Sequence, residues 1–163
     1  MLFDHPAHEA KEARALRLAS AIEQAGRATP HVTCHVMAHD EEFVTVAPPA
    51  SRQALASLGS STGNDPLAAL RFAVRRMRLD PSHARWMILL REREPTGCTS
   101  EELARFARQA SARHGMRISI VNVYPLRAAS LDDVDVSGRD FDHVARRFLR
   151  WFGEVARTLA CVS

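Results

Sequence analysis

The chain contains little cysteine, and no arrangement of cysteines that would hold a disulfide framework or a zinc ion. Its 163 residues include only Cys34, Cys98 and Cys161, which lie far apart. Disulfide-rich domains and zinc sites use paired cysteines at short, regular spacings. We therefore expect reduced and mostly buried thiols. A nucleophilic Cys98 would need a neighbouring base to form the thiolate, and the sequence places no such base beside it.

Long apolar runs and targeting signals are also missing. No apolar stretch approaches the roughly 18 residues that a membrane-spanning helix needs. The first residues carry acids and histidines, whereas a signal peptide would carry a basic patch followed by an apolar segment. We therefore expect a cytoplasmic protein that has no membrane partner.

Lysine is almost absent, and Lys11 is the only one. The net charge of +3 and the isoelectric point near 9.1 are compatible with nucleic-acid binding. The arginines, however, are spread among acids over several helical stretches, and there is no RNA-binding aromatic motif or glycine-rich phosphate loop. We expect solvated helix faces and no nucleic-acid partner. No serine-protease order, nucleophile elbow or dinucleotide fingerprint occurs, so we assign no catalytic residue.

What the sequence does have is an alternation of strand and helix patterns within one domain, residues 1–163. Apolar runs at 86–91 and 117–123 are typical of strands buried on both faces. The runs 31–37 and 43–46 are joined by a charged turn and predict an antiparallel pair. The fold class expected is α/β, with a doubly wound, mostly parallel sheet, helices on both faces and one antiparallel edge strand.

Local signals mark where the helices begin and end. An amphipathic pattern over 9–26 predicts the first helix. Asp65 followed by Pro66 predicts the start of a second helix that runs to about Leu79. Thr99 with Glu102 forms a capping box for a third helix that ends near Gly115. Residues 126–138 are predicted to form an acidic loop. Asp140 then precedes a final helix that carries an apolar stripe. The stripe comprises Phe141, Val144, Phe148, Phe152, Val155 and Leu159.

An acidic turn follows the strand at 86–91. It reads Glu92-Arg93-Glu94-Pro95-Thr96-Gly97 and is bounded by proline and glycine. Open α/β sheets bind their ligands at the carboxyl ends of their strands, so the turn lies where a site is expected.

This turn, with what precedes and follows it, resembles the fourth strand of a von Willebrand factor A domain. In that family the strand ends in Asp-Gly, often continued as Glu-Pro-Thr-Gly, and helps to form a metal-ion-dependent adhesion site. Here Glu92-Arg93 replaces Asp-Gly. The family's Asp-x-Ser-x-Ser motif is matched by residues 4–8, which keep Asp4 and lose both serines. A second family motif has a Thr at the start of a helix, and this Thr is matched by Asp65. The order of elements agrees with that of the family over nearly the whole chain. Residues 148–152 look like the last helix of the tellurium-resistance branch of this family.

The resemblance implies a bacterial, non-enzymatic protein–protein interaction module with a degenerate adhesion site. Its partner would be a protein, for example within an ATPase-containing assembly. The interaction surface would be the loop edge built from residues 4–8, 59–65 and 92–98. The residues that the resemblance assigns to a metal are Asp4, His8, Asp65 and Glu92, and those assigned to the interaction are Arg91, Arg93, Thr62 and Asn64.

Two interpretations of the carboxylates remain open. In the first, Asp4, Asp65 and Glu92 converge with His8 on a divalent cation such as magnesium, manganese, iron or zinc, and the protein is a small metal-dependent enzyme. In the second, no cofactor is bound, Asp65 caps its helix, and Arg93 or Arg91 supplies the positive charge. The second is favoured because an arginine stands where the family's glycine lets the backbone approach the ion.

Overall fold

The computed structural model describes most of the chain from residue 17 onward, and we restrict the structural account to those residues. The elements follow the chain in the order β1, β2, α3, β3, α4, β4, β5 and α5. The described residues are 17–26, 28, 34–35, 37–39, 44–46, 65–79, 85–91, 94–123, 133–136 and 141–160.

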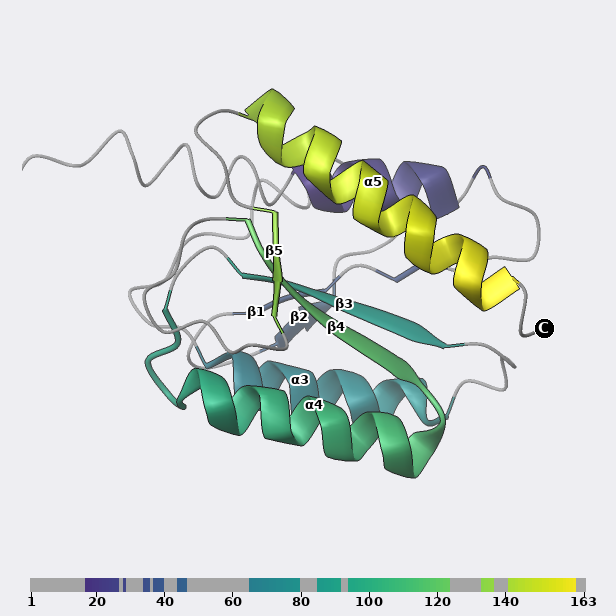
Figure 1. Cartoon of the computed structure of the whole chain (residues 1–163). Coiled ribbons are helices and arrows are strands. Elements are labelled where there is room, and N and C mark those ends of the chain that lie inside the picture. Colours follow the sequence, from purple (N-terminus) through teal and green to yellow (C-terminus); the bar gives the residue numbers. More distant parts are fainter. Residues whose placement is uncertain are drawn as a thin grey trace, which may run out of the picture.

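A three-stranded parallel sheet lies at the centre (Figure 1). Its strands are β3 (Trp86–Arg91), β4 (Arg117–Asn122) and β5 (Val134–Asp135), in that spatial order. β3 and β4 pair along their full length, from Trp86 opposite Arg117 to Arg91 opposite Asn122. The prediction that these two runs are parallel strands of an α/β sheet is therefore confirmed.

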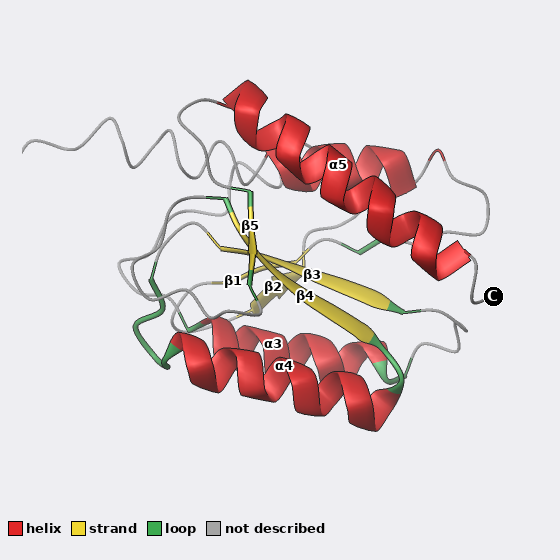
Figure 2. Cartoon of the chain, viewed as in Figure 1, coloured by secondary structure: helices red, strands yellow, loops and turns green. Residues whose placement is uncertain are grey.

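Helices cover both faces of this sheet (Figure 2). On one face lie α3 (Pro66–Met77) and α4 (Ser100–His114). Alternate strand residues point toward them and form one core cluster with Leu70 and Leu103. The strand residues in this cluster or packed against it are Met87, Leu89, Ile118 and Ile120.

The opposite face packs against α5 (Phe141–Ala160) and the helical segment 17–26. The second core cluster joins Leu18 of that segment to Val121 of β4 and Val144 of α5. An aromatic group seals the end of β3 against α5: Trp86 stacks on Phe152 at 5.0 Å between ring centroids and meets Trp151 edge-on at 5.6 Å. The aromatic residues near 148–152 therefore have a packing role.

The early antiparallel pair is present, but it starts later than predicted. β1 (Met37–His39) pairs with β2 (Val44–Val46) as a separate two-stranded sheet within the described residues. Cys34 and His35, which the alternating pattern of the sequence places in the first strand, lie outside it. The prediction of a loop over 126–138 is wrong at 134–135, because Val134 and Asp135 pair with β4 and Val136 is buried in the second core cluster.

The helix ends follow the local chemistry of the sequence. The Asp65 carboxylate accepts the Ala68 N–H at 2.9 Å with Pro66 at the first helical position, and α3 ends at Met77 before a short turn. Thr99 and Glu102 form the complete capping box of α4, and Gly115 ends that helix with φ of 59°. The start of the first predicted helix, 9–16, and Asp140 lie outside the described residues.

Candidate functional site

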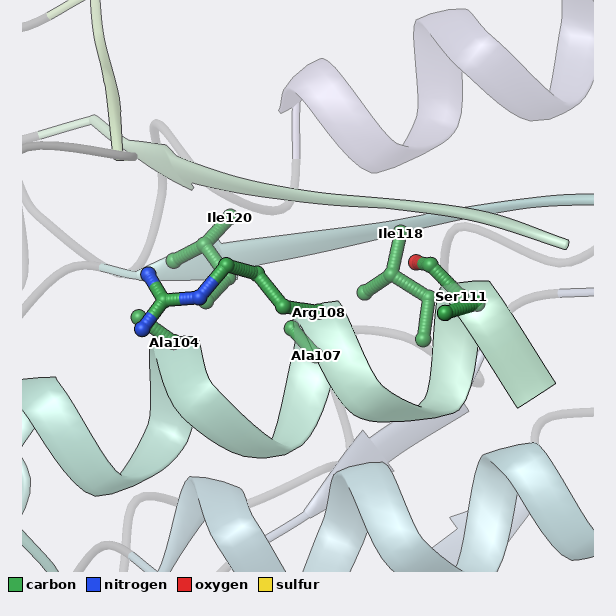
Figure 3. A pocket seen from close by; sticks show the side chains of 7 residues that line it. Ala104, Ala107, Arg108, Ser111, Ile118 and Ile120 are labelled. Carbon is green, nitrogen blue, oxygen red and sulfur yellow. The ribbon is translucent and has the colours of Figure 1, made fainter.

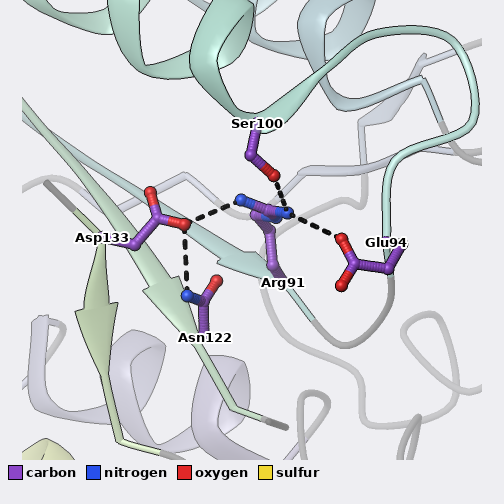
Figure 4. Close-up of polar contacts among 5 residues, drawn as sticks. All are labelled: Arg91, Glu94, Ser100, Asn122 and Asp133. Atoms are coloured by element: carbon purple, nitrogen blue, oxygen red, sulfur yellow. Dashed lines mark hydrogen bonds and ion pairs between the residues drawn. The ribbon is translucent and has the colours of Figure 1, made fainter. Parts of the chain in front are cut away.

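Among the described residues, the carboxyl edge of the sheet holds the buried side chain of Arg91, at the end of β3. It is only 2% exposed, although arginine is rarely buried unless it is paired. Its Nη1 donates to Oδ2 of Asp133 at 2.9 Å, and its Nη2 donates to Oγ of Ser100 at 2.9 Å (Figure 4). The guanidinium thus connects β3 to the first turn of α4 and to the residue before β5.

Asp133 is as deeply buried as its partner, since its side chain is 1% exposed. It also accepts a hydrogen bond from Nδ2 of Asn122 at 3.2 Å. Asn122 lies opposite Arg91 in the β3–β4 register, so both side chains emerge on the face that α4 covers. A buried ion pair offsets its desolvation only when further hydrogen bonds hold both charges, and Ser100 and Asn122 supply such bonds.

Glu94 adds a weaker interaction from the acidic turn. Its Oε2 lies 3.9 Å from Nη2 of Arg91, and its side chain is 40% exposed. Solvent screens such a contact, so it contributes less than the buried pair with Asp133. Glu94 nevertheless places the start of the 94–98 loop beside the guanidinium. We refer to Arg91, Glu94, Ser100, Asn122 and Asp133 as the Arg91 cluster.

The Arg91 cluster has the chemistry of a fixed cation. An arginine side chain stays protonated throughout the physiological range, so it cannot act as a general base or exchange its proton during a reaction. Two buried atoms, Arg91 Nε and Asn122 Oδ1, have no hydrogen-bond partner among the described residues. The cluster therefore places a permanent positive charge beside the Asp133 carboxylate at the strand ends.

Asp65 and Gly97 bring two further segments of the predicted site into contact. A Cβ atom added to Gly97 would lie 2.8 Å from Cγ and 3.0 Å from Cβ of Asp65. The glycine thus lets the turn after β3 approach the start of α3 closely. For Asp65, the capping role of the second interpretation is confirmed by its bond to Ala68.

Cys98 lies near enough to Asp65 and Arg91 for their charges to act on its thiol. Burial raises the pKa of its thiol, and the carboxylates of Asp65 and Glu102 act in the same direction. The hydrogen bond with the backbone of Leu67 is the second-largest influence and lowers the pKa, and the Arg91 guanidinium lowers it by the smallest amount. A raised pKa disfavours the nucleophilic thiolate, in agreement with the expectation of a passive thiol.

Most of the predicted site residues lie outside the part of the chain that the structure describes. Of the eight, Asp65 and Arg91 are described and both belong to this edge. Within the described ranges no group of three or more histidine, cysteine, aspartate or glutamate side chains could hold a metal ion. The metal set remains a prediction because three of its members are not described. The residues outside the described ranges are Asp4, His8, Thr62, Asn64, Glu92 and Arg93.

The structure adds Ser100, Asn122 and Asp133, which the sequence analysis did not identify. Asn122 had a usable signal, since it is a polar residue at the end of an apolar strand run, where site residues of open α/β sheets occur. Ser100 follows a recognised helix cap. Asp133 carried no local signal that distinguished it from its acidic neighbours.

Comparisons of the chain with protein-family models, with curated proteins and with solved structures each find no match. Among the described residues, none of the helices combines the length and apolar character that crossing a membrane requires.

Proposed function

We propose that this chain is a protein-interaction module of the von Willebrand factor A type in which a buried arginine takes the place of the metal ion. The observation that carries the proposal is the Arg91–Asp133 pair at the carboxyl edge of the sheet, where the family has its adhesion site. The doubly wound form of that fold is part of the proposal. The parallel sheet between two helical layers and the order of the motifs support it.

The donor set around Arg91 suits a guanidinium better than a divalent cation. One oxygen of Asp133 already receives hydrogen bonds from Arg91 and Asn122, and one oxygen of Asp65 caps α3. Magnesium would require about six oxygen ligands in octahedral geometry at about 2 Å. A guanidinium instead uses planar N–H donors that match separate carboxylate and hydroxyl acceptors.

The surface offered to a partner is the turn that follows β3. Thr96 and Gly97 are exposed. The same turn contacts the Arg91 guanidinium through the Glu94 carboxylate, and Gly97 lies against Asp65. A loop with exposed tips on a fixed base loses little conformational freedom on binding, which favours recognition. Interaction at this edge therefore needs no metal.

Site-specific photocrosslinking tests the proposal. A photoreactive residue replaces Thr96 in the turn, and the matched control places it at Arg113, an exposed residue in the last turn of α4 at the opposite end of the sheet. In the cells that naturally produce the protein, we expect discrete protein adducts from position 96, unchanged by EDTA, and none of these from position 113. Identical adducts from both positions, or none from position 96, would contradict the proposal.

A further inference from the structure

The outer edge of β4 is only partly covered by its neighbour. β5 pairs with Val121 and Asn122 alone, so within the described residues no strand lies beside 117–120. Figure 1 shows β5 crossing only one end of β4. An uncovered strand edge presents backbone donors and acceptors that can template another strand.

The printed hydrogen bonds show which groups face that edge. The N–H groups of Arg117 and Val123 donate to the carbonyls of Arg85 and Arg91 at 2.8 and 2.9 Å. The backbone N–H and C=O groups of odd-numbered residues of β4 therefore point toward β3. The carbonyl of Asn122 accepts a hydrogen bond from the N–H of Val136 at 3.1 Å, so the backbone groups of even-numbered residues point away from β3. Because direction alternates along a strand, the N–H and C=O of Ile118 and the N–H of Ile120 face away from β3, on the side where no described strand lies beside residues 117–120.

An apolar groove runs directly under this edge, between β4 and α4 (Figure 3). Its volume is about 350 Å³, which is within the range of small-ligand sites. The side chains of Ile118 and Ile120 point from the strand toward the helix, and small residues of α4 leave the space open. The helix residues that line the groove are Ala104, Ala107, Arg108, Ser111 and Ala112.

We propose that this edge of β4 is a docking site for an extended segment of a partner protein. The segment adds a strand beside residues 117–120 and places an apolar side chain in the groove under Ile118 and Ile120. Strand addition of this kind draws its affinity from backbone hydrogen bonds and its specificity from pockets for alternate side chains. A small apolar ligand would fill the groove but would leave the outward backbone groups without partners.

Charge at the rim indicates acidic residues on the segment. Arg117 is exposed at the start of the edge, and Arg108 lines the groove. Arg108 contacts Glu101 at 3.2 Å, and both side chains are more than half exposed. Because exposed ion pairs contribute little free energy, Arg108 can exchange Glu101 for an acidic residue of the segment at little cost in free energy. The docking segment therefore alternates apolar and acidic residues. This surface differs from the turn after β3, and the inference does not depend on the function proposed above.

Amide hydrogen exchange of the free protein provides the first test. We expect the Ile118 and Ile120 amides to exchange at least about tenfold faster than those of Ser119 and Val121, which face β3, since a hydrogen-bonded amide exchanges only on opening. Equal protection of all four at every protein concentration would mean that the chain covers its own edge. Protection that appears only at high concentration would identify a second copy as the occupant. Either result overturns the proposal.

Binding is then measured with a defined probe, the peptide acetyl-Glu-Val-Glu-Val-Glu-amide, by NMR titration. We expect the Ile118 and Ile120 amides to shift and to become protected. Ile118→Pro removes the outward N–H without touching the ladder to β3, and Ser111→Leu fills the groove. Each should weaken binding at least about tenfold, as expected for the loss of one hydrogen bond or one side-chain site.

The matched controls are Ile118→Val, which keeps the N–H, and Ser111→Ala, which keeps the groove open. Both should bind the peptide within about twofold of the parent protein, because neither removes a hydrogen bond or side-chain site that the peptide uses. Thermal melting establishes that each variant is folded. Absence of binding to the parent protein, or binding that Ile118→Pro and Ser111→Leu both leave unchanged, would overturn the proposed site.

Discussion

At the scale of single residues, the buried charge pair between Arg91 and Asp133 joins the end of β3 to the residue before β5. Removing one partner of a buried ion pair leaves an uncompensated charge and typically costs about 3–5 kcal/mol. We therefore expect Arg91→Met to lower the free energy of unfolding by about that amount in urea denaturation. The control is Arg108→Met, which breaks the exposed pair with Glu101 and should cost less than about 1 kcal/mol.

The double variant Arg91→Met/Asp133→Leu distinguishes an ion pair from simple loss of packing. Because it removes both charges, its destabilisation should be well below the sum of the two single variants. Strictly additive effects would show that the two side chains do not act as a pair.

Gly97 is the second residue on which the site depends. The Cβ of an alanine there would lie 2.8 Å from Cγ of Asp65, so Gly97→Ala should lower the free energy of unfolding by about 1–3 kcal/mol. Gly153→Ala is the matched control, since its Cβ meets nothing within 4 Å and it lies inside α5. That change should be neutral or should stabilise by up to about 1 kcal/mol. Equal effects of the two substitutions in urea denaturation would exclude the close approach of Asp65.

At the scale of elements, the start of α4 depends on its capping box in a pH-dependent way. The backbone N–H of Thr99, followed by its hydroxyl, lowers the pKa of Glu102 below the usual 4.5. A carboxylate whose pKa is lower in the folded state stabilises the fold above its unfolded pKa and ceases to do so as pH falls through the folded value.

Glu102→Ala should therefore melt below the parent protein at pH 7, because it lacks the carboxylate that the cap uses, and the gap should close at pH values below 4.5. The control is Glu101→Ala, next to it in the same turn but outside the box. A gap that stays constant down to the acid limit would show that the charge of Glu102 is not what stabilises the cap.

The elements that could be predicted from sequence are those set by local chemistry. Helix starts at Asp65 and Thr99 depend on side chains that reach three residues along the chain, and β3 and β4 are continuous apolar runs. β5 was missed because it is two residues long and its apolar Val134 stands between acids. Its strand conformation comes from pairing with β4, which lies earlier in the chain.

The candidate site was predictable only in part for the same reason. Arg91 was one of two arginines expected to supply positive charge, and Asp65 was expected either to cap or to bind metal. Asp133, the partner of Arg91, lies 42 positions further along the chain. No local pattern indicates which acid of that segment reaches the guanidinium, because the pairing is set by the order of strands in the sheet.

At the scale of the whole molecule, two helical layers cover the two faces of a parallel sheet. The Arg91 cluster joins β3, α4 and the start of β5, so its integrity affects the sheet and one helical layer together. Arg85 has a related role at the opposite end of the sheet, where its guanidinium donates to the carbonyls of Met77 and His114 at 3.3 and 2.6 Å. These carbonyls belong to the last residues of α3 and α4, where positive charge is favourable.

The central claim is that a fixed guanidinium, and not a divalent cation, neutralises the strand-end carboxylates. The most direct test is the melting temperature of the purified protein after EDTA treatment and after addition of magnesium or manganese, with metal content measured by elemental analysis. We predict less than one equivalent of metal and the same melting temperature in all three conditions, since only a ligand that binds the folded state raises it. A chelator-induced fall in melting temperature, reversed by the metal and accompanied by stoichiometric metal in the untreated protein, would contradict the account.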